Sequence, residues 1–552
     1  MCAQATTDVF ADPLGAPTMS RSIAFFLALL ALAAPRLAAQ HAHGQDDLGV
    51  VRFAVSCDAR VQPGFDRGVA LLHHMMYEDA RRAFEAVAEE DPGCAMAHWG
   101  IAATLFQPLW PTRPTPAELA LGWEETQRAR ALGPGSDRER ALLASAEAFF
   151  REPETAEWWT RIERWAAAME EAYRGHPDDT ETAAFYALSQ LAIGQIAEDR
   201  LAHNERAAEI LLAIHESEPT HPGAIHYTIH ANDVDARADE SLDIVRGYSG
   251  IAPSVPHALH MPTHIFVRLG EWPGVIEWNR RSADAALEVD AGDGISGHYP
   301  HATDYLLYAH LQRGDDEQAR AVLAETLERE RFQDIFTSAF HLAAMPARFA
   351  VERRAWAEAA AIEPRAPASL SWDRYTWPEA ISWFARGVGA ARSGDLAAAR
   401  DAEARMTALR DRASDTGERD FATYIEVDRL VLSGWMAHAE GDAETAIERM
   451  RAATELEATV QKHPVSPGAL LPPYEALGDL LLELERPAEA LAAYESSLET
   501  WPGRYNTLLG AARAAAAVPA AAKARAYYAK LLEVVGDAAS TRPGVREARA
   551  YR

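Results

Sequence analysis

Three histidines stand close together in one short stretch of the sequence, "PHALHMPTHIF" at residues 256–266. His257, His260 and His264 follow one another at intervals of three and four residues. On an α-helix these intervals place the side chains on one face. Neutral imidazole is the commonest metal ligand among protein side chains. The stretch therefore predicts a helix that presents a row of potential metal ligands.

The same spacing occurs once more, upstream in the chain. The segment "HPGAIHYTIHAND" contains His226 and His230, which are four residues apart. His226 precedes His260 by 34 residues, and His230 precedes His264 by the same interval. A pair that recurs at a fixed period indicates two neighbouring helices presenting the same face. Adjacent helices pack with their axes about 8–10 Å apart, so we predict that these four imidazoles converge on one metal ion.

More polar side chains continue the same rows along the chain. His301 falls in the row of His257, Asp304 in the row of His260, and His341 returns to the first row. We predict His257, His301, Asp304 and His341 to be further ligands, or hydrogen-bond partners that orient the ligands. Twelve of the 20 histidines lie between residues 203 and 341. The predicted metal chemistry is therefore confined to one region of the chain.

The donor atoms limit which metals fit. Imidazoles with one carboxylate suit Zn, Cu, Ni or non-haem Fe, and the cluster contains no cysteine that could supply a thiolate. Four histidine ligands would make a structural or carrier site, whereas three ligands would leave a position open for water or substrate. The sequence contains no phosphate-binding loop, dinucleotide fingerprint or nucleophile elbow. Whether the chain is an enzyme stays open.

The elements that must position these residues are helices. Segments with the same phase of small, aromatic and proline residues recur, and a Gly-Asp pair marks the turn between helices at Gly314, Gly394 and Gly441. This pattern resembles the tetratricopeptide repeat (TPR) family over about residues 60–535. The resemblance implies an all-α solenoid, a right-handed superhelix of helix–turn–helix repeats. It also implies that the histidine rows lie on the concave groove, where the family binds ligands.

The histidine-rich segments, together with "DPGCAMAHWGIA" at 91–102, resemble a bacterial group of exported TPR proteins to which no reaction is firmly attached. We divide the chain into segments by its proline-rich stretches and its repeats. These are a leader and signal peptide (1–40), an N-terminal tail (41–59), a repeat block with the histidine-lined groove (60–362), a proline-rich connection (363–378), a second repeat block (379–538) and a tail (539–552).

The N-terminus predicts export. Arg21 precedes the apolar run "IAFFLALLALAA", which is too short to span a bilayer comfortably and is typical of a secretory signal. Either Met1 or Met19 could be the start. No other segment indicates a membrane span. We expect a bacterial protein in the periplasm or the medium.

Charge and cysteine content narrow the partners and the redox state. The formal net charge of −29 argues against a nucleic-acid partner, which requires a basic surface. Export permits a disulfide between Cys57 and Cys94, and the alternative is two buried thiols.

The leading hypothesis is an exported TPR protein that binds a divalent transition metal through His226, His230, His260 and His264. One alternative is a scaffold whose groove binds a peptide or protein partner, and the other is a metal-dependent enzyme of unknown substrate.

Overall fold

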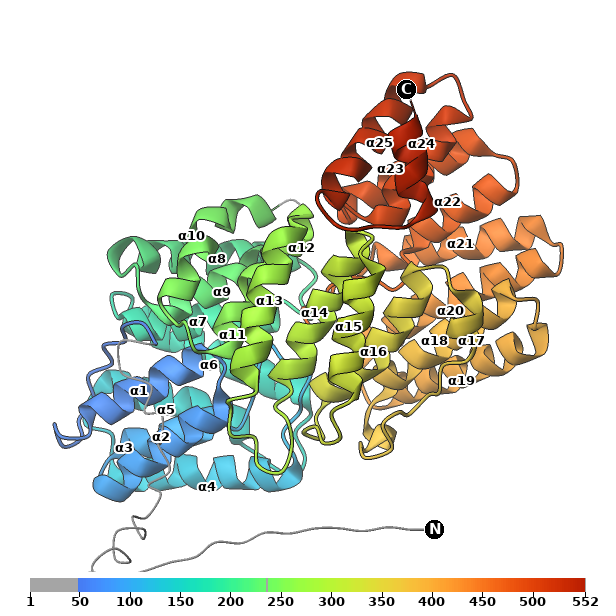
Figure 1. Ribbon diagram of the computed structural model, residues 1–552. Helices are drawn as coiled ribbons and strands as arrows, with labels where there is room; N and C mark the ends of the chain where they lie inside the picture. Colours follow the sequence, from blue (N-terminus) through green and yellow to red (C-terminus); the bar gives the residue numbers. More distant parts are fainter. Residues whose placement is uncertain (1–47, 235–236, 552) are drawn as a thin grey trace, which may run out of the picture. The chain divides into compact units, whose positions relative to one another are not determined.

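A computed structural model describes residues 48–234 and 237–551 of the chain. These residues belong to one compact unit, and in it successive helices pack side by side along the chain (Figure 1). Over the described ranges the only β-type pairing is a single bridge between Ile295 and Phe332. The predicted all-α solenoid of helix pairs is confirmed. The predicted signal peptide and both possible starts lie outside the described residues.

The first half of the array runs from α1 to α13. Its helices are α1 (Gln62–His73), α2 (Tyr77–Glu90), α3 (Ala95–Ala103), α4 (Pro116–Leu132), α5 (Asp137–Phe150), α6 (Trp158–Gly175), α7 (Thr180–Ile193), α8 (Arg200–Ser217), α9 (Pro222–Asn232), η2 (Ala238–Ser241), α10 (Leu242–Gly247), η3 (Tyr248–Gly250), α11 (Pro256–His260), α12 (Pro262–Leu269) and α13 (Trp272–Ala286).

The second half continues to the C-terminus. Its helices are α14 (His298–Gln312), α15 (Asp316–Leu327), α16 (Phe336–Glu352), α17 (Trp356–Ala360), η4 (Trp372–Arg374), α18 (Thr376–Arg392), α19 (Leu396–Asp415), α20 (Arg419–Ala439), α21 (Ala443–Glu457), α22 (Pro473–Glu483), α23 (Pro487–Thr500), α24 (Tyr505–Ala516), α25 (Ala521–Val535) and α26 (Pro543–Ala550).

The Gly-Asp pairs are the turns inside three helix pairs. Gly314, Gly394 and Gly441 have positive φ angles of 69°, 85° and 84°. Glycine adopts this conformation without steric cost. The aspartate that follows each glycine caps the next helix; the Asp395 side chain, for example, accepts a hydrogen bond from the Ala398 N–H. Two adjacent residues therefore end one helix and start its partner.

The proline-rich stretch at 363–378 does not separate two blocks in space. α16, which precedes the stretch, packs on α18, which begins within the stretch at Thr376 and continues beyond it. The C-terminal region also contacts helices near the middle of the chain: the Trp272 indole N–H in α13 donates to the Gly503 carbonyl at 2.9 Å, and Arg542 forms an ion pair with Asp316 in α15 at 2.6 Å. The predicted C-terminal tail contains the helix α26.

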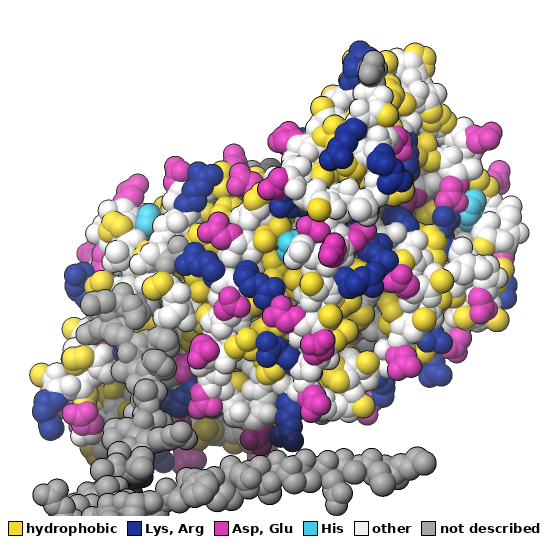
Figure 2. Space-filling view, in the orientation of Figure 1, with side chains coloured by type: hydrophobic (Ala, Val, Ile, Leu, Met, Phe, Trp, Pro, Cys, Tyr) yellow, Lys and Arg dark blue, Asp and Glu magenta, His cyan; other side chains and the backbone are white. Residues whose placement is uncertain are grey.

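The surface mixes charges of both signs. On the face in Figure 2, acidic and basic side chains alternate and few histidines are visible. Among the described residues, no helix combines the length and the apolar character that a membrane span requires.

Cys57 and Cys94 are joined by a disulfide in the structure, and are not present as two buried thiols. We expect a chain lacking Cys2 to show no free thiol when it is unfolded without reductant. Reduction should lower the free energy of unfolding by about 3–4 kcal/mol, because the bridge restricts the unfolded chain. Thiol titration and urea unfolding, with and without reductant, measure both effects. Two reactive thiols in each chain would show that the bridge does not form.

Candidate metal centre

The histidine stretch at 256–266 is helical but interrupted. Pro262 has no N–H and cannot continue the hydrogen-bond ladder, so α11 ends at His260 and α12 starts at Pro262. Met261 between them keeps right-handed helical angles, φ −53° and ψ −41°, and the direction of the chain is maintained. The predicted single helix is therefore two short helices, which carry His257 and His260 on one and His264 on the other.

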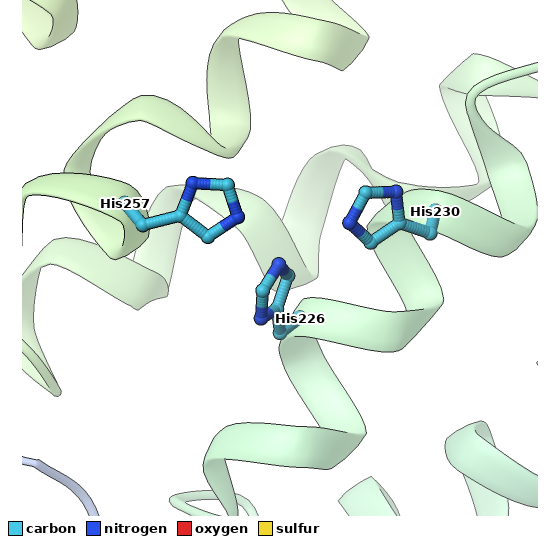
Figure 3. Close-up of side chains that lie close together, drawn as sticks. All are labelled: His226, His230 and His257. Atoms are coloured by element: carbon cyan, nitrogen blue, oxygen red, sulfur yellow. The ribbon is translucent and has the colours of Figure 1, made fainter. Parts of the chain in front are cut away.

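Three histidines from two helices meet at one point. His226 and His230 extend from α9 and His257 from α11, and the three rings face a common centre (Figure 3). One nitrogen of each ring lies within 4.8 Å of the others. The ring centroids of His226 and His230 are 5.1 Å apart, and those of His226 and His257 are 4.9 Å apart. We call this set the first triad.

The first triad has nitrogens without hydrogen-bond partners. The His226 Nδ1–H donates to the His73 carbonyl at 2.6 Å, which places the proton on Nδ1 and a lone pair on Nε2. The Nε2 atoms of His226 and His230 are buried and unpartnered, as are both ring nitrogens of His257. Buried polar atoms are almost always hydrogen-bonded. Several convergent exceptions make this position a candidate binding site.

The environment keeps these rings neutral. Burial, aided by the neighbouring imidazoles, lowers the pKa of His226 and of His257 well below the usual value. Burial, together with the proximity of His264, lowers the pKa of His230 to about 3. A neutral imidazole is the form that binds a metal. At neutral pH the first triad therefore offers lone pairs without first having to lose protons.

The other predicted ligands form a second triad next to the first. His260, His264 and His301 also place one nitrogen each within 4.8 Å of one another. The four histidines predicted to share one ion are thus divided between two triads, although the rings of His230 and His264 remain 6.0 Å apart. His257 and His301, predicted as supporting residues, complete the two sets.

The remaining predicted residues lie behind the second triad. The His341 Nδ1–H donates to Asp304 at 2.9 Å, and His341 Nε2 lies 2.7 Å from His301 Nδ1. Arg348 pairs with the other oxygen of Asp304 at 3.0 Å, and the side chains of His341, Asp304 and Arg348 are fully buried. Asp304 and His341 therefore orient the His301 ring.

Both triads are covered by other segments of the chain. The side chains of His226, His260 and His264 are at most 1% exposed. Two segments of the chain lie over the triads. The covering residues are Leu109, Trp110 and Pro111 in one segment and His463, Pro464 and Val465 in the other. Together with His230, His257, His264 and His301 they line a cavity of about 30 Å³. These segments come from connections between helices, and the sequence offered no periodic signal for their positions.

A third group contains two histidines and a glutamate but has no free position. Glu181 accepts from His73 at 2.7 Å and from His221 at 3.2 Å. The second nitrogen of His221 accepts the Ala224 N–H, and that of His73 lies 3.0 Å from the Tyr227 hydroxyl. Every ring nitrogen is hydrogen-bonded, so this group is a structural network.

The buried histidines predict a loss of stability in acid. Burial lowers the pKa of fully buried His74 to about 4, below the value of 6.5 expected of the unfolded chain. Between these values the unfolded chain binds more protons, so stability falls as the pH is lowered through this window, by up to about 1.4 kcal/mol per pH unit for one such group. We expect thermal midpoints, measured with a chelator present, to fall by several degrees from pH 7.5 to pH 5. Equal midpoints would contradict this.

The similarity of this chain to known proteins is low. No family model and no curated protein matches the sequence. Among solved structures, yeast Tom70 is 12% identical with a TM-score of 0.35 over 90% of this chain and 96% of its own. The TPR domain of P58(IPK) is 12% identical with a TM-score of 0.21 over 89% and 98%. The fold is a tetratricopeptide-type solenoid. The helix pairs themselves show this fold, because similarities this low support no inference about fold or function.

Proposed function

We propose that this tetratricopeptide-type solenoid binds a divalent transition metal at the first triad. The observation that supports it is the convergence of His226, His230 and His257, whose buried nitrogens have no other partner. The His73 carbonyl fixes the tautomer of His226, as hydrogen-bond partners of metal-binding histidines commonly do. Three neutral imidazoles suit Zn, Cu, Ni or Fe and leave a coordination position for water.

The spacing of the ligand atoms agrees with this function. Metal–nitrogen bonds of about 2.0–2.1 Å require ligand nitrogens to be no more than about 4 Å apart. The nitrogens of the first triad lie within 4.8 Å of one another. Small rotations of the rings would bring them into range. In the exported protein that we propose, in the periplasm or the medium, this centre would be a carrier, structural or catalytic site.

A single substitution tests the proposal. We expect His226→Gln to bind one tightly held Zn²⁺ fewer than the wild-type chain, because it removes the ligand whose tautomer is fixed. At a free Zn²⁺ concentration about 1,000 times the dissociation constant, binding stabilises the native state by about 4 kcal/mol, so the variant should also lose part of the zinc-dependent rise in melting temperature. Equilibrium dialysis with elemental analysis, on protein prepared without a histidine tag, measures the first effect.

The matched control is His98→Gln. His98 is a buried histidine outside both triads, hydrogen-bonded to Glu125 at 2.6 Å. The His98→Gln variant should bind as much zinc as the wild type. If His226→Gln retains the same number of ions with the same affinity, the first triad is not a metal site.

A second candidate function is binding of a peptide or protein partner, which the repeat fold supports in general. Helices α14 and α16 already hold a non-helical stretch of the chain through its backbone carbonyls: the Tyr305 hydroxyl donates to Pro464 at 2.7 Å, and Arg348 donates to Gly468 at 3.0 Å. A partner at this place would have to displace that stretch. Fluorescence anisotropy with labelled proline-rich peptides tests this, and absence of binding would remove the candidate.

The third candidate function is a metal-dependent enzyme, and one cavity near the histidines could hold a substrate. A cavity of about 190 Å³ adjoins the histidine region, and His463 lines both this cavity and the small one over the triads. Its walls include Trp377, Tyr424 and Trp501. A substrate held there would be separated from the triads by the segment that carries His463.

A further inference from the structure

We infer that the second triad, His260, His264 and His301, binds its own metal ion, so that the chain has a two-metal centre. The inference rests on the proposed function, because it adds an ion beside the one held by His226, His230 and His257. It differs from the prediction of a single ion shared by four histidines. The support comes from hydrogen bonds that fix which nitrogens carry protons.

His260 and His264 point lone pairs at each other. His260 Nδ1 lies 2.7 Å from Asn279 Oδ1. The amide of Asn279 donates to the Val275 carbonyl, so its oxygen faces the ring and the ring must donate. His264 Nδ1 lies 2.9 Å from a carboxylate oxygen of Asp233 and must also donate. In their neutral forms both rings therefore have unprotonated Nε2 atoms.

These two Nε2 atoms are 3.0 Å apart. Two lone pairs at this distance repel each other, and a cation between or beside them removes the repulsion. A metal ion satisfies both atoms at once, since both already have the orientation that ligation requires. Hydrogen bonds from the opposite nitrogen to an amide or carboxylate oxygen are the usual support of metal-binding histidines.

Hydrogen bonds also fix the tautomer of the third ring, His301. His341 donates its Nδ1 proton to Asp304 and accepts at Nε2, which fixes the His301 proton on Nδ1. The remaining nitrogen of His301 therefore carries a lone pair. The ring centroids of His260 and His301 are 4.1 Å apart. One nitrogen from each member of the second triad lies within 4.8 Å of the others.

The two triads share one cavity. His230 and His257 of the first triad and His264 and His301 of the second line the same space of about 30 Å³. Six neutral imidazoles carry no negative charge. The adjacent carboxylates already pair with cations, Asp233 with Arg268 and Lys462, and Asp304 with Arg348. Two buried dications would require compensation, so the cavity, which is large enough for one water molecule, would hold hydroxide or another small anion.

The test counts ions in four forms of the full chain. Wild type, His257→Gln, His301→Gln and the control His98→Gln are titrated with Zn²⁺ by calorimetry, and bound zinc is counted after dialysis. We expect two ions in wild type and the control, and one ion in each triad variant. Circular dichroism shows whether each variant is folded. A Co²⁺ titration of wild type alone, followed by visible absorbance, should saturate at two equivalents, and this result stands even if a variant fails to fold.

Each other outcome has a distinct meaning. One ion in wild type that is lost in His257→Gln and retained in His301→Gln overturns the second site and leaves the proposed function intact. One ion that is lost in both variants indicates a single shared site, with only a proton between His260 and His264, and also overturns the inference. One ion that is lost only in His301→Gln, or no ion in wild type, overturns the two-metal centre together with the proposed first site.

Discussion

Asp304→Asn should destabilise the protein by about 3–5 kcal/mol, because it removes the counter-ion of a fully buried arginine. Arg348 has no exposed surface, and its ion pair with Asp304, at 3.0 Å, is the only one it forms over residues 48–234 and 237–551. Asparagine keeps the shape and loses the charge. Thermal and urea unfolding with a chelator present measure the change. The variant should also bind the second ion more weakly, since Asp304 orients His301 through His341.

The control for this prediction is an exposed ion pair. Asp79 and Arg82 lie three residues apart on α2, and their side chains are 33% and 47% exposed. Exposed pairs of this kind contribute at most about 1 kcal/mol, so Asp79→Asn should have little effect. If Asp304→Asn unfolds with the same midpoint as Asp79→Asn, the buried pair does not stabilise this part of the array.

Phe84→Ala should cost a similar amount, about 3–5 kcal/mol, by leaving a cavity between two helix pairs. Phe84 is completely buried, and its ring fills the space left by two glycines of neighbouring helices. A Cβ atom added at Gly68 would lie 2.7 Å from this ring, and one added at Gly100 would lie 2.4 Å from it. The ring is therefore enclosed on both sides, and the site has little freedom to collapse. Thermal and urea unfolding measure the loss.

The converse substitution tests the same contact from the other side. Gly100→Ala should destabilise the protein by about 1–3 kcal/mol, because the added methyl group overlaps the Phe84 ring. The control is Leu201→Ala, since the leucine is 49% exposed. This surface change should alter the stability by no more than about 0.5 kcal/mol. A cost for Phe84→Ala no larger than that of Leu201→Ala would show that this ring does not hold the two helix pairs together.

The repeat architecture could be predicted because it depends on local patterns. Gly314, Gly394 and Gly441 end helices through a backbone conformation that glycine favours, and the aspartates after them cap the next helices. The aromatic positions follow the same phase: Tyr494 lies against Gly478 and Gly510 much as Phe84 lies against Gly68 and Gly100. Such signals involve residues within about one repeat of each other, so the sequence contains them directly.

The histidine rows could also be predicted, up to a point. The interval of 34 residues between His226 and His260 places equivalent residues on neighbouring helices, and the structure brings all the predicted ligands into one region. The interval does not determine which rings meet. Pro262 divides the helix, and His230 groups with His226 and His257 instead of sharing one point with His260 and His264. Ring orientation depends on hydrogen bonds to residues such as Asn279 and Asp233, which no repeat period specifies.

The closure of the site was decided by tertiary structure alone. Trp110 and His463 cover the triads from connections that lie far from the histidine helices in the sequence. Their positions depend on how the whole array curves and on where the C-terminal helices return, as the bond from Trp272 to Gly503 shows. Periodicity and capping determine each helix and its partner, because those interactions are local. The covered, buried environment that makes the imidazoles neutral arises from contacts between distant segments, and only the assembled fold specifies them.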